Sequence, residues 1–171
     1  MNTGPEVAIV AVVDTIAMGT TVGAKRAGLL CMPDGTARWR DFDPPGAATL
    51  TRTVAAALRA RQIEVSGDDD VIYGPASDPP RRIVRVSLLG AELTLCRTKF
   101  GIAGQRVRGT LTVRWEEFDR AARRSVAIDD YRISIEAKDL PQDGPTALLL
   151  NAVTRSADRW ATERGMDKPQ Y

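Results

Sequence analysis

Residues 105–118, which read QRVRGTLTVRWEEF, decide the fold class because their side chains alternate between apolar and polar. Alternation with a period of two is typical of a β-strand that buries one face. The neighbouring stretches are similar: residues 82–96 (RIVRVSLLGAELTLC) alternate in part, and residues 125–137 (SVAIDDYRISIEA) place β-branched side chains among polar ones. The links at 98–104 and 119–124 are short enough for hairpins. These three stretches therefore predict an antiparallel meander with one buried face.

The N-terminal part of the chain predicts further strands. Val7–Val13 (VAIVAVV) is an uninterrupted apolar run rich in β-branched residues, which favours a buried central strand. Residues 27–32 and 36–41 flank Pro33-Asp34-Gly35, and Asp-Gly between two short runs predicts the turn of a β-hairpin. Residues 16–25 contain glycines and threonines and predict a loop.

Two stretches predict amphipathic helices. In residues 47–61, apolar side chains recur every four positions on one face: Leu50, Val54 and Leu58. A final helix is expected to open at Asp143-Gly144-Pro145 and to end at Gly165, with an apolar face formed by Leu149, Val153, Ala157 and Trp160. We therefore predict an α+β fold. It consists of a largely antiparallel sheet (N-terminal strand, hairpin and three-strand meander) with both helices packed on one face.

Length and composition predict a single domain. The chain has 171 residues, of which 43% are hydrophobic and 27% charged, close to the average for soluble globular proteins. We expect one domain over residues 1–171, with its core at about 6–165 and a polar tail at 166–171. The longest apolar run, Val7–Val13, is far shorter than the roughly 20 residues of a membrane-spanning helix, so no transmembrane segment is expected.

The absence of histidine restricts the chemistry. Without any His, the chain cannot assemble a Ser-His-Asp or Cys-His nucleophile. Residues 19–25 (GTTVGAK) have too short a gap between their glycines for a phosphate-binding loop, so an ordinary loop is the better interpretation. Asp68-Asp69-Asp70 are consecutive, which favours a solvated turn over a calcium loop. We predict a non-enzymatic protein with no catalytic residue, metal or cofactor, and an enzyme that uses carboxylates alone is the alternative.

The overall charge is balanced, with 24 basic and 22 acidic residues and a net charge of +2. Nucleic-acid-binding proteins usually carry a strongly basic surface, so no nucleic-acid partner is expected. One local basic stretch nevertheless predicts a binding surface, formed by Arg97, Lys99, Arg106 and Arg108. An acidic protein, a lipid headgroup or a polysaccharide would complement this surface.

The two cysteines each end an apolar stretch, Gly28–Cys31 and Leu93–Cys96. Two cysteines without histidine cannot complete a four-ligand zinc site. Their spacing leaves two alternatives open: a disulfide that closes a long loop, or two buried free thiols.

The sequences around both cysteines and at the end of the second long strand form one combined pattern: LLCMPDG at 29–35, RWRD at 38–41, LTLC at 93–96 and GTLTVRWEEFDR at 109–120. This pattern resembles that of proteobacterial cell-envelope domains, which occur as lipoproteins or periplasmic modules. More loosely, it is similar to the auxiliary lipoproteins of envelope transport and secretion systems. The resemblance covers most of residues 7–162 and implies an adaptor or assembly role. It also implies an oxidising compartment, where a Cys31–Cys96 disulfide is favoured over free thiols.

The resemblance and the N-terminus leave two locations open. Residues 1–6 lack the basic and apolar regions of a secretory signal. The protein is therefore expected in the periplasm or at the outer membrane, with a signal or lipid anchor absent from this sequence, or alternatively in the cytoplasm. We predict a non-enzymatic envelope adaptor or assembly module that binds an envelope protein partner and allows peripheral membrane association. The alternative is a periplasmic domain that binds a small ligand, a lipid or a glycan.

Overall fold

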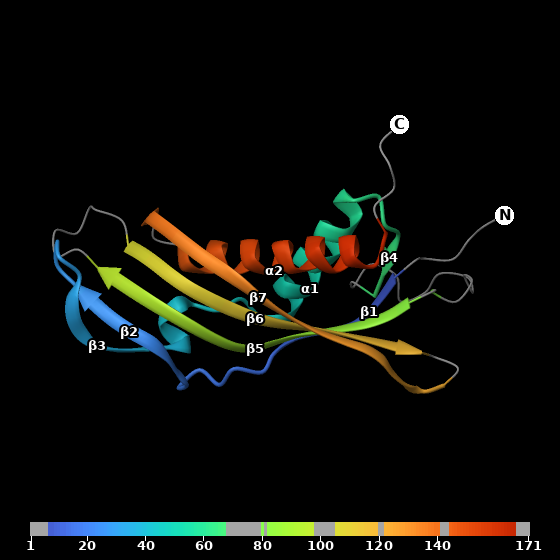
Figure 1. Cartoon of the computed structure of the whole chain (residues 1–171), viewed down its shortest axis with the longest axis horizontal. Helices are drawn as coiled ribbons and strands as arrows, with labels where there is room; N and C mark the ends of the chain where they lie inside the picture. The colour runs from blue at the N-terminus through green and yellow to red at the C-terminus, as the bar shows by residue number, and fades with distance from the viewer. Residues whose placement is uncertain are drawn as a thin grey trace.

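The structure is a computed structural model that describes residues 7–67, 80, 82–97, 105–119, 122–140 and 144–166. The molecule is elongated, and the strand β5 (Arg82–Arg97) runs along most of its length (Figure 1). With 16 residues at about 3.3 Å each, β5 is roughly 50 Å long. It pairs with other strands on both sides and forms the axis of the sheet.

The predicted meander is present in the C-terminal half. β5 pairs antiparallel with β6 (Gln105–Asp119), which pairs antiparallel with β7 (Arg124–Leu140). The apolar residues of the alternating pattern are buried on one face, as Val107 and Trp115 illustrate. The opposite face carries mainly polar side chains, with Val126 and Ile128 of β7 as exposed apolar exceptions, and contains a cross-strand ion pair of 2.7 Å between Arg114 Nε and Asp130 Oδ1. The period of two in the sequence therefore identified the buried face of these strands.

The other side of β5 corrects the prediction of a largely antiparallel sheet. β1 (Val7–Asp14) and β2 (Thr21–Ala27) both run parallel to β5, β1 along its first half and β2 along its second half. β4 (Val65–Ser66) adds in parallel to β1, so the sheet is mixed. Parallel pairing requires a crossover, and the long connection between β2 and β5, which contains a helix, provides it. The loop expected at 16–25 is shorter than predicted because β2 begins at Thr21.

The first hairpin is displaced from its predicted position. β2 pairs antiparallel with β3 (Met32–Arg38), and the chain reverses at Gly28–Cys31, not at Pro33–Gly35. A register shift makes Asp34 the extra residue of a β-bulge, and Gly35 has a φ of 121°. The Asp-Gly pair therefore bends a strand, whereas the prediction placed the turn there.

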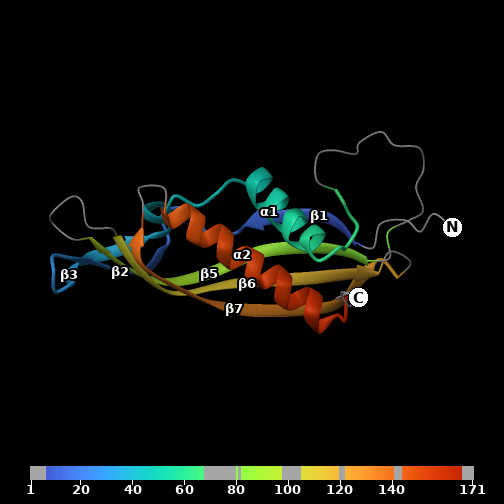
Figure 2. The same cartoon turned by 90° about the horizontal axis from the view of Figure 1, so that it is seen from above.

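Both helices lie on one face of the sheet, as predicted (Figure 2). After a short 3-10 helix, η1 (Trp39–Phe42), α1 (Ala47–Ala60) packs on β1. α2 (Gly144–Glu163) packs on β6 and β7 and also contacts α1. The predicted apolar faces are buried: Leu50, Val54 and Leu58 in α1, and Leu149, Val153, Ala157 and Trp160 in α2. Helical spacing in the sequence thus predicted which side chains meet the sheet.

Two stacked indole rings join α2 to the sheet. Trp115 of β6 and Trp160 of α2 are fully buried, and their ring centroids lie 4.6 Å apart at an interplanar angle of 17°. The Nε1–H of Trp115 donates to Ser156 Oγ at 3.2 Å, and the Ser156 hydroxyl donates to Val153 O at 2.7 Å. The buried indole N–H of Trp115 and the buried hydroxyl of Ser156 therefore both have hydrogen-bond partners, as burial requires.

Two glycines allow the strands to approach closely in the half of the sheet that contains β2. A Cβ on Gly109 of β6 would lie 1.9 Å from Glu92 O, and one on Gly23 of β2 would lie 1.9 Å from Leu93 O. Both glycines pair with Leu93 of β5. A side chain at either position would push a neighbouring strand out of register.

Candidate functional site

β2 and β3 are joined by an exposed apolar turn, which lies at one end of the molecule. We call residues Gly28–Met32 the hairpin tip. The turn is closed by a hydrogen bond of 3.1 Å from Cys31 N–H to Gly28 O. Its two central residues, Leu29 and Leu30, are 74% and 84% exposed, and Met32 is 61% exposed. Single exposed apolar residues are ordinary, but these are adjacent at one tip, which makes the tip a candidate contact surface.

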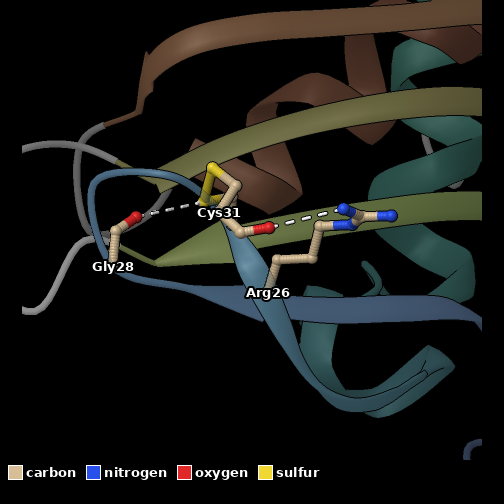
Figure 3. Close-up of a disulfide and its surroundings, with 4 residues drawn as sticks. Arg26, Gly28 and Cys31 are labelled. Carbon is tan, nitrogen blue, oxygen red and sulfur yellow. Dashed lines mark hydrogen bonds between the residues drawn. A yellow bond between two sulfur atoms is a disulfide. The ribbon is translucent and has the colours of Figure 1, made fainter.

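A disulfide attaches the hairpin tip to β5. Cys31 and Cys96 are bonded, and their Cα atoms lie 5.6 Å apart (Figure 3). Gly28 N–H donates to Arg97 O at 2.9 Å, and Arg26 Nη1 donates to Cys31 O at 3.4 Å. Gly28 O also lies 3.9 Å from Cys96 Sγ, which is a van der Waals contact because a disulfide sulfur has no proton to donate. The tip is thus held to the sheet by a covalent bond and by the backbone.

An open hollow of about 500 Å³ lies beside the hairpin tip. It is lined by Ala27, Gly28, Leu29, Leu30, Met32, Pro33 and Asp34. Asp34 is the one charged side chain of this lining, and the rest is mainly apolar. Specific small-molecule sites usually contain several convergent polar groups. The composition of this hollow therefore suits an apolar group better than a sugar.

The predicted basic surface lies partly beside the tip. Arg97 is the last residue of β5, and Arg106 of β6 pairs with Cys96. Both arginines are exposed, as is Arg108 farther along β6, whereas Lys99 lies outside the described residues. Within the described part of the chain, none of these three arginines forms an ion pair. Their charges are therefore available to a partner.

Sequence reasoning missed the apolar tip itself. Residues 27–32 were expected to form a strand, whereas Leu29 and Leu30 occupy the turn. The glycine at position 28 could have indicated the turn, because its φ of 78° is a conformation that glycine adopts readily. Arg26 was missed as well, although it pairs with Cys96 in the register of β2 and β5.

The carboxylates near the end of β6 form structural ion pairs. Glu117 is buried and accepts from Arg82 Nη1 at 2.6 Å and from Arg164 Nε at 3.1 Å. Arg164 also donates to Asp129 at 2.5 Å. Burial alone would lower the pKa of Arg164, but the two carboxylates raise it above its ordinary value. Glu116 follows the strand alternation onto the opposite face, so it does not pair with Glu117.

A second polar contact joins the end of α2 to β7. Tyr131 O–H donates to Glu163 Oε2 at 2.7 Å, and Arg159 lies over the Tyr131 ring at 5.1 Å. Burial, together with the hydrogen bond to Glu163, raises the pKa of Tyr131 well above its ordinary value of 10.0. The same hydrogen bond and the nearby Arg159 lower the pKa of Glu163. The two pKa shifts keep Tyr131 protonated and Glu163 ionised, which are the states that form this hydrogen bond.

The described residues contain neither a metal-binding cluster nor a helix that could span a membrane. They contain no group of three or more Cys, Asp or Glu residues placed to hold a metal ion. Asp68-Asp69-Asp70 lie outside them. No helix in this part of the chain has both the length and the hydrophobicity needed to cross a bilayer.

Comparisons with known proteins include a solved structure with a similar fold. No family model and no curated protein matches the sequence. A DUF330-family protein from Xanthomonas campestris has a TM-score of 0.52 at 9% identity, over 96% of this chain and 88% of that chain. An uncharacterised protein scores 0.48 at 12% identity, over 95% and 92% of the two chains. A proposed lipoprotein from Caulobacter crescentus scores 0.38 at 16% identity, over 87% and 94%. The first of these scores is above 0.5, and this chain shares the fold of that DUF330 protein over nearly its whole length.

Proposed function

We propose that this chain is a non-catalytic adaptor of the bacterial cell envelope. The observation that carries this proposal is the hairpin tip, where exposed leucines are attached to the sheet by a disulfide. Disulfides persist in oxidising compartments such as the periplasm, which supports an envelope location. A rigid, exposed apolar turn supports a role in contact with another component.

The protein partner is proposed to bind the open face of the sheet around Arg108. The two α-helices of the described residues pack on the other face of the sheet, and the β6 side chains on the open face are largely polar or charged. Arg108 is exposed and has no ion pair with a described residue. An acidic protein surface would complement it and would guide association electrostatically.

The second candidate function is the binding of a small apolar ligand. The hollow of about 500 Å³ beside the tip supports it, because its lining favours an acyl chain over a glycan.

Site-specific photocrosslinking in the native host tests the adaptor proposal. A photoreactive residue at Arg108 is expected to capture one defined envelope protein. The same residue at Arg124, which is exposed at the start of β7, is the matched control and is expected not to capture it. Capture of cytosolic proteins alone would contradict the proposal. In the same cells, alkylation without a reductant is expected to leave both cysteines unmodified, and free thiols there would contradict the envelope location.

A further inference from the structure

We infer that the hairpin tip inserts into the surface of an anionic lipid bilayer. This inference deepens the proposed function, on whose envelope location it rests, by naming what the tip contacts. It follows from the shape of the tip, from its composition and from the charges around it.

The apolar part of the tip suits a bilayer better than a protein. The turn between β2 and β3 lies at one end of the elongated molecule (Figure 1). Leu29, Leu30 and Met32 at this turn are 74%, 84% and 61% exposed. Specific protein interfaces bury about 800 Å² on each partner and are enriched in Tyr and Trp. Three aliphatic side chains on a convex turn offer neither the area nor the aromatic residues. They can, however, lose their water-exposed surface by entering the acyl region of a membrane.

The basic residues around the tip lie where the headgroups would be. Arg26, Cys96 and Arg106 stand in one row across β2, β5 and β6. Arg97 is next to the turn, since its carbonyl accepts from Gly28 N–H. Asp34 is the acidic residue of the tip lining, so it reduces the positive charge without reversing it. Arginines just behind an apolar tip add attraction to anionic lipids and can remain at headgroup depth.

The disulfide makes insertion easier because it orders the turn in advance. A flexible loop would lose conformational freedom on entering the bilayer, which weakens binding. The Cys31–Cys96 bond and the turn hydrogen bond already fix the backbone of the tip. In addition, α1 and α2 lie over the sheet behind the tip in Figure 2, so they do not block its approach to a flat surface.

Flotation of the oxidised full chain with vesicles tests this inference. Vesicles of phosphatidylcholine with 30% phosphatidylglycerol are expected to bind the protein at least tenfold more tightly than pure phosphatidylcholine vesicles. The double variant Leu29→Ser/Leu30→Ser and, separately, Arg97→Glu/Arg106→Glu are each expected to weaken binding more than tenfold. The matched controls are Val126→Ser/Ile128→Ser, which are 50% and 54% exposed on β7, and Arg124→Glu. These controls are expected to bind as wild type does.

Depth is measured with Leu30→Trp and bromine-labelled lipids. The three natural tryptophans are fully buried, so quenching on anionic vesicles is expected from position 30 alone. Absence of binding to either vesicle, or equal binding by the leucine variant and wild type, would overturn the inference. The inference is also overturned if Leu29→Ser/Leu30→Ser binds vesicles as wild type does but no longer captures a protein in the photocrosslinking experiment. The tip would then bind a protein. Because the vesicles contain no partner protein, the flotation result does not depend on whether a photoreactive residue at Arg108 captures a protein in cells.

Discussion

Breaking the Cys31–Cys96 disulfide is expected to destabilise the protein by about 4 kcal/mol at 25 °C. The two cysteines are 65 residues apart in sequence, and chain-entropy loss scales with the logarithm of the closed loop, which gives this magnitude. The bond acts mainly on the unfolded chain, which it keeps compact. Its removal is therefore expected to raise the urea m-value as well, since the unfolded chain then exposes more surface.

The assay is urea unfolding of oxidised wild type, reduced wild type and the variant Cys31→Ser/Cys96→Ala. Trp39, Trp115 and Trp160 are fully buried, so their fluorescence reports the loss of the core. Leu30→Ser is the control, because Leu30 is in the same turn but largely exposed, and it is expected to change stability by less than about 0.5 kcal/mol. A loss below about 1 kcal/mol in both disulfide-free forms, with an unchanged m-value, would refute the view that the bond constrains the unfolded chain.

Three further predictions concern the core, the sheet and the alkaline range. Trp160→Ala is expected to cost about 3–5 kcal/mol in urea unfolding, because it empties a buried site stacked on Trp115. Trp160→Phe is expected to cost less, and equal losses for both variants would argue against the packing explanation. Gly109→Ala is expected to prevent or severely impair folding, since its Cβ would lie 1.9 Å from Glu92 O, and a wild-type circular dichroism spectrum and melting temperature would count against this reasoning. Because the pKa of Tyr131 is raised above 10.0, the folded state keeps the phenol proton that the unfolded state releases. The raised pKa of Tyr131 contributes fully to the free energy of unfolding below pH 10. This contribution is lost as the pH rises further, by at most about 1.4 kcal/mol per pH unit. Unfolding at pH 9 and pH 11 is expected to show a smaller decrease for Tyr131→Phe than for wild type.

The parts of the fold that the sequence predicted are those controlled by local periodicity. The spacing of Leu50, Val54 and Leu58 identified the buried face of α1, and alternation around Val107 and Trp115 identified that of β6. These patterns depend on whether a side chain meets the core, which neighbouring residues in the sequence reveal.

The missed features depend on contacts between distant segments. Alternation does not say which strand becomes a neighbour, so the parallel pairing of β1 with β5 was not predicted. The Asp34-Gly35 pair suits both a turn and a bulge, and only the register with β2 decides between them. Because the turn was predicted at Pro33–Gly35 and lies at Gly28–Cys31, the exposure of Leu29 and Leu30 was not predicted either. At the candidate site, therefore, the pairing of Cys31 with Cys96 is confirmed, the binding surface at Arg97 and Arg106 stays a prediction, and the apolar turn was not predicted.

The end-to-end placement of β1 and β2 along β5 also sets an order of events during folding. The meander of β5, β6 and β7 joins segments that are close in sequence, and such local pairs form first. β1 and β2 pair with β5 across long separations, as between Val7 and Arg82, so they are expected to dock late. β2 leads directly into the turn that holds Cys31, so its docking beside β5 brings Cys31 to Cys96 in the native geometry. In the folded protein the bond then joins a strand that docks late to the strand at the axis of the sheet, so it opposes the detachment of β2 from β5.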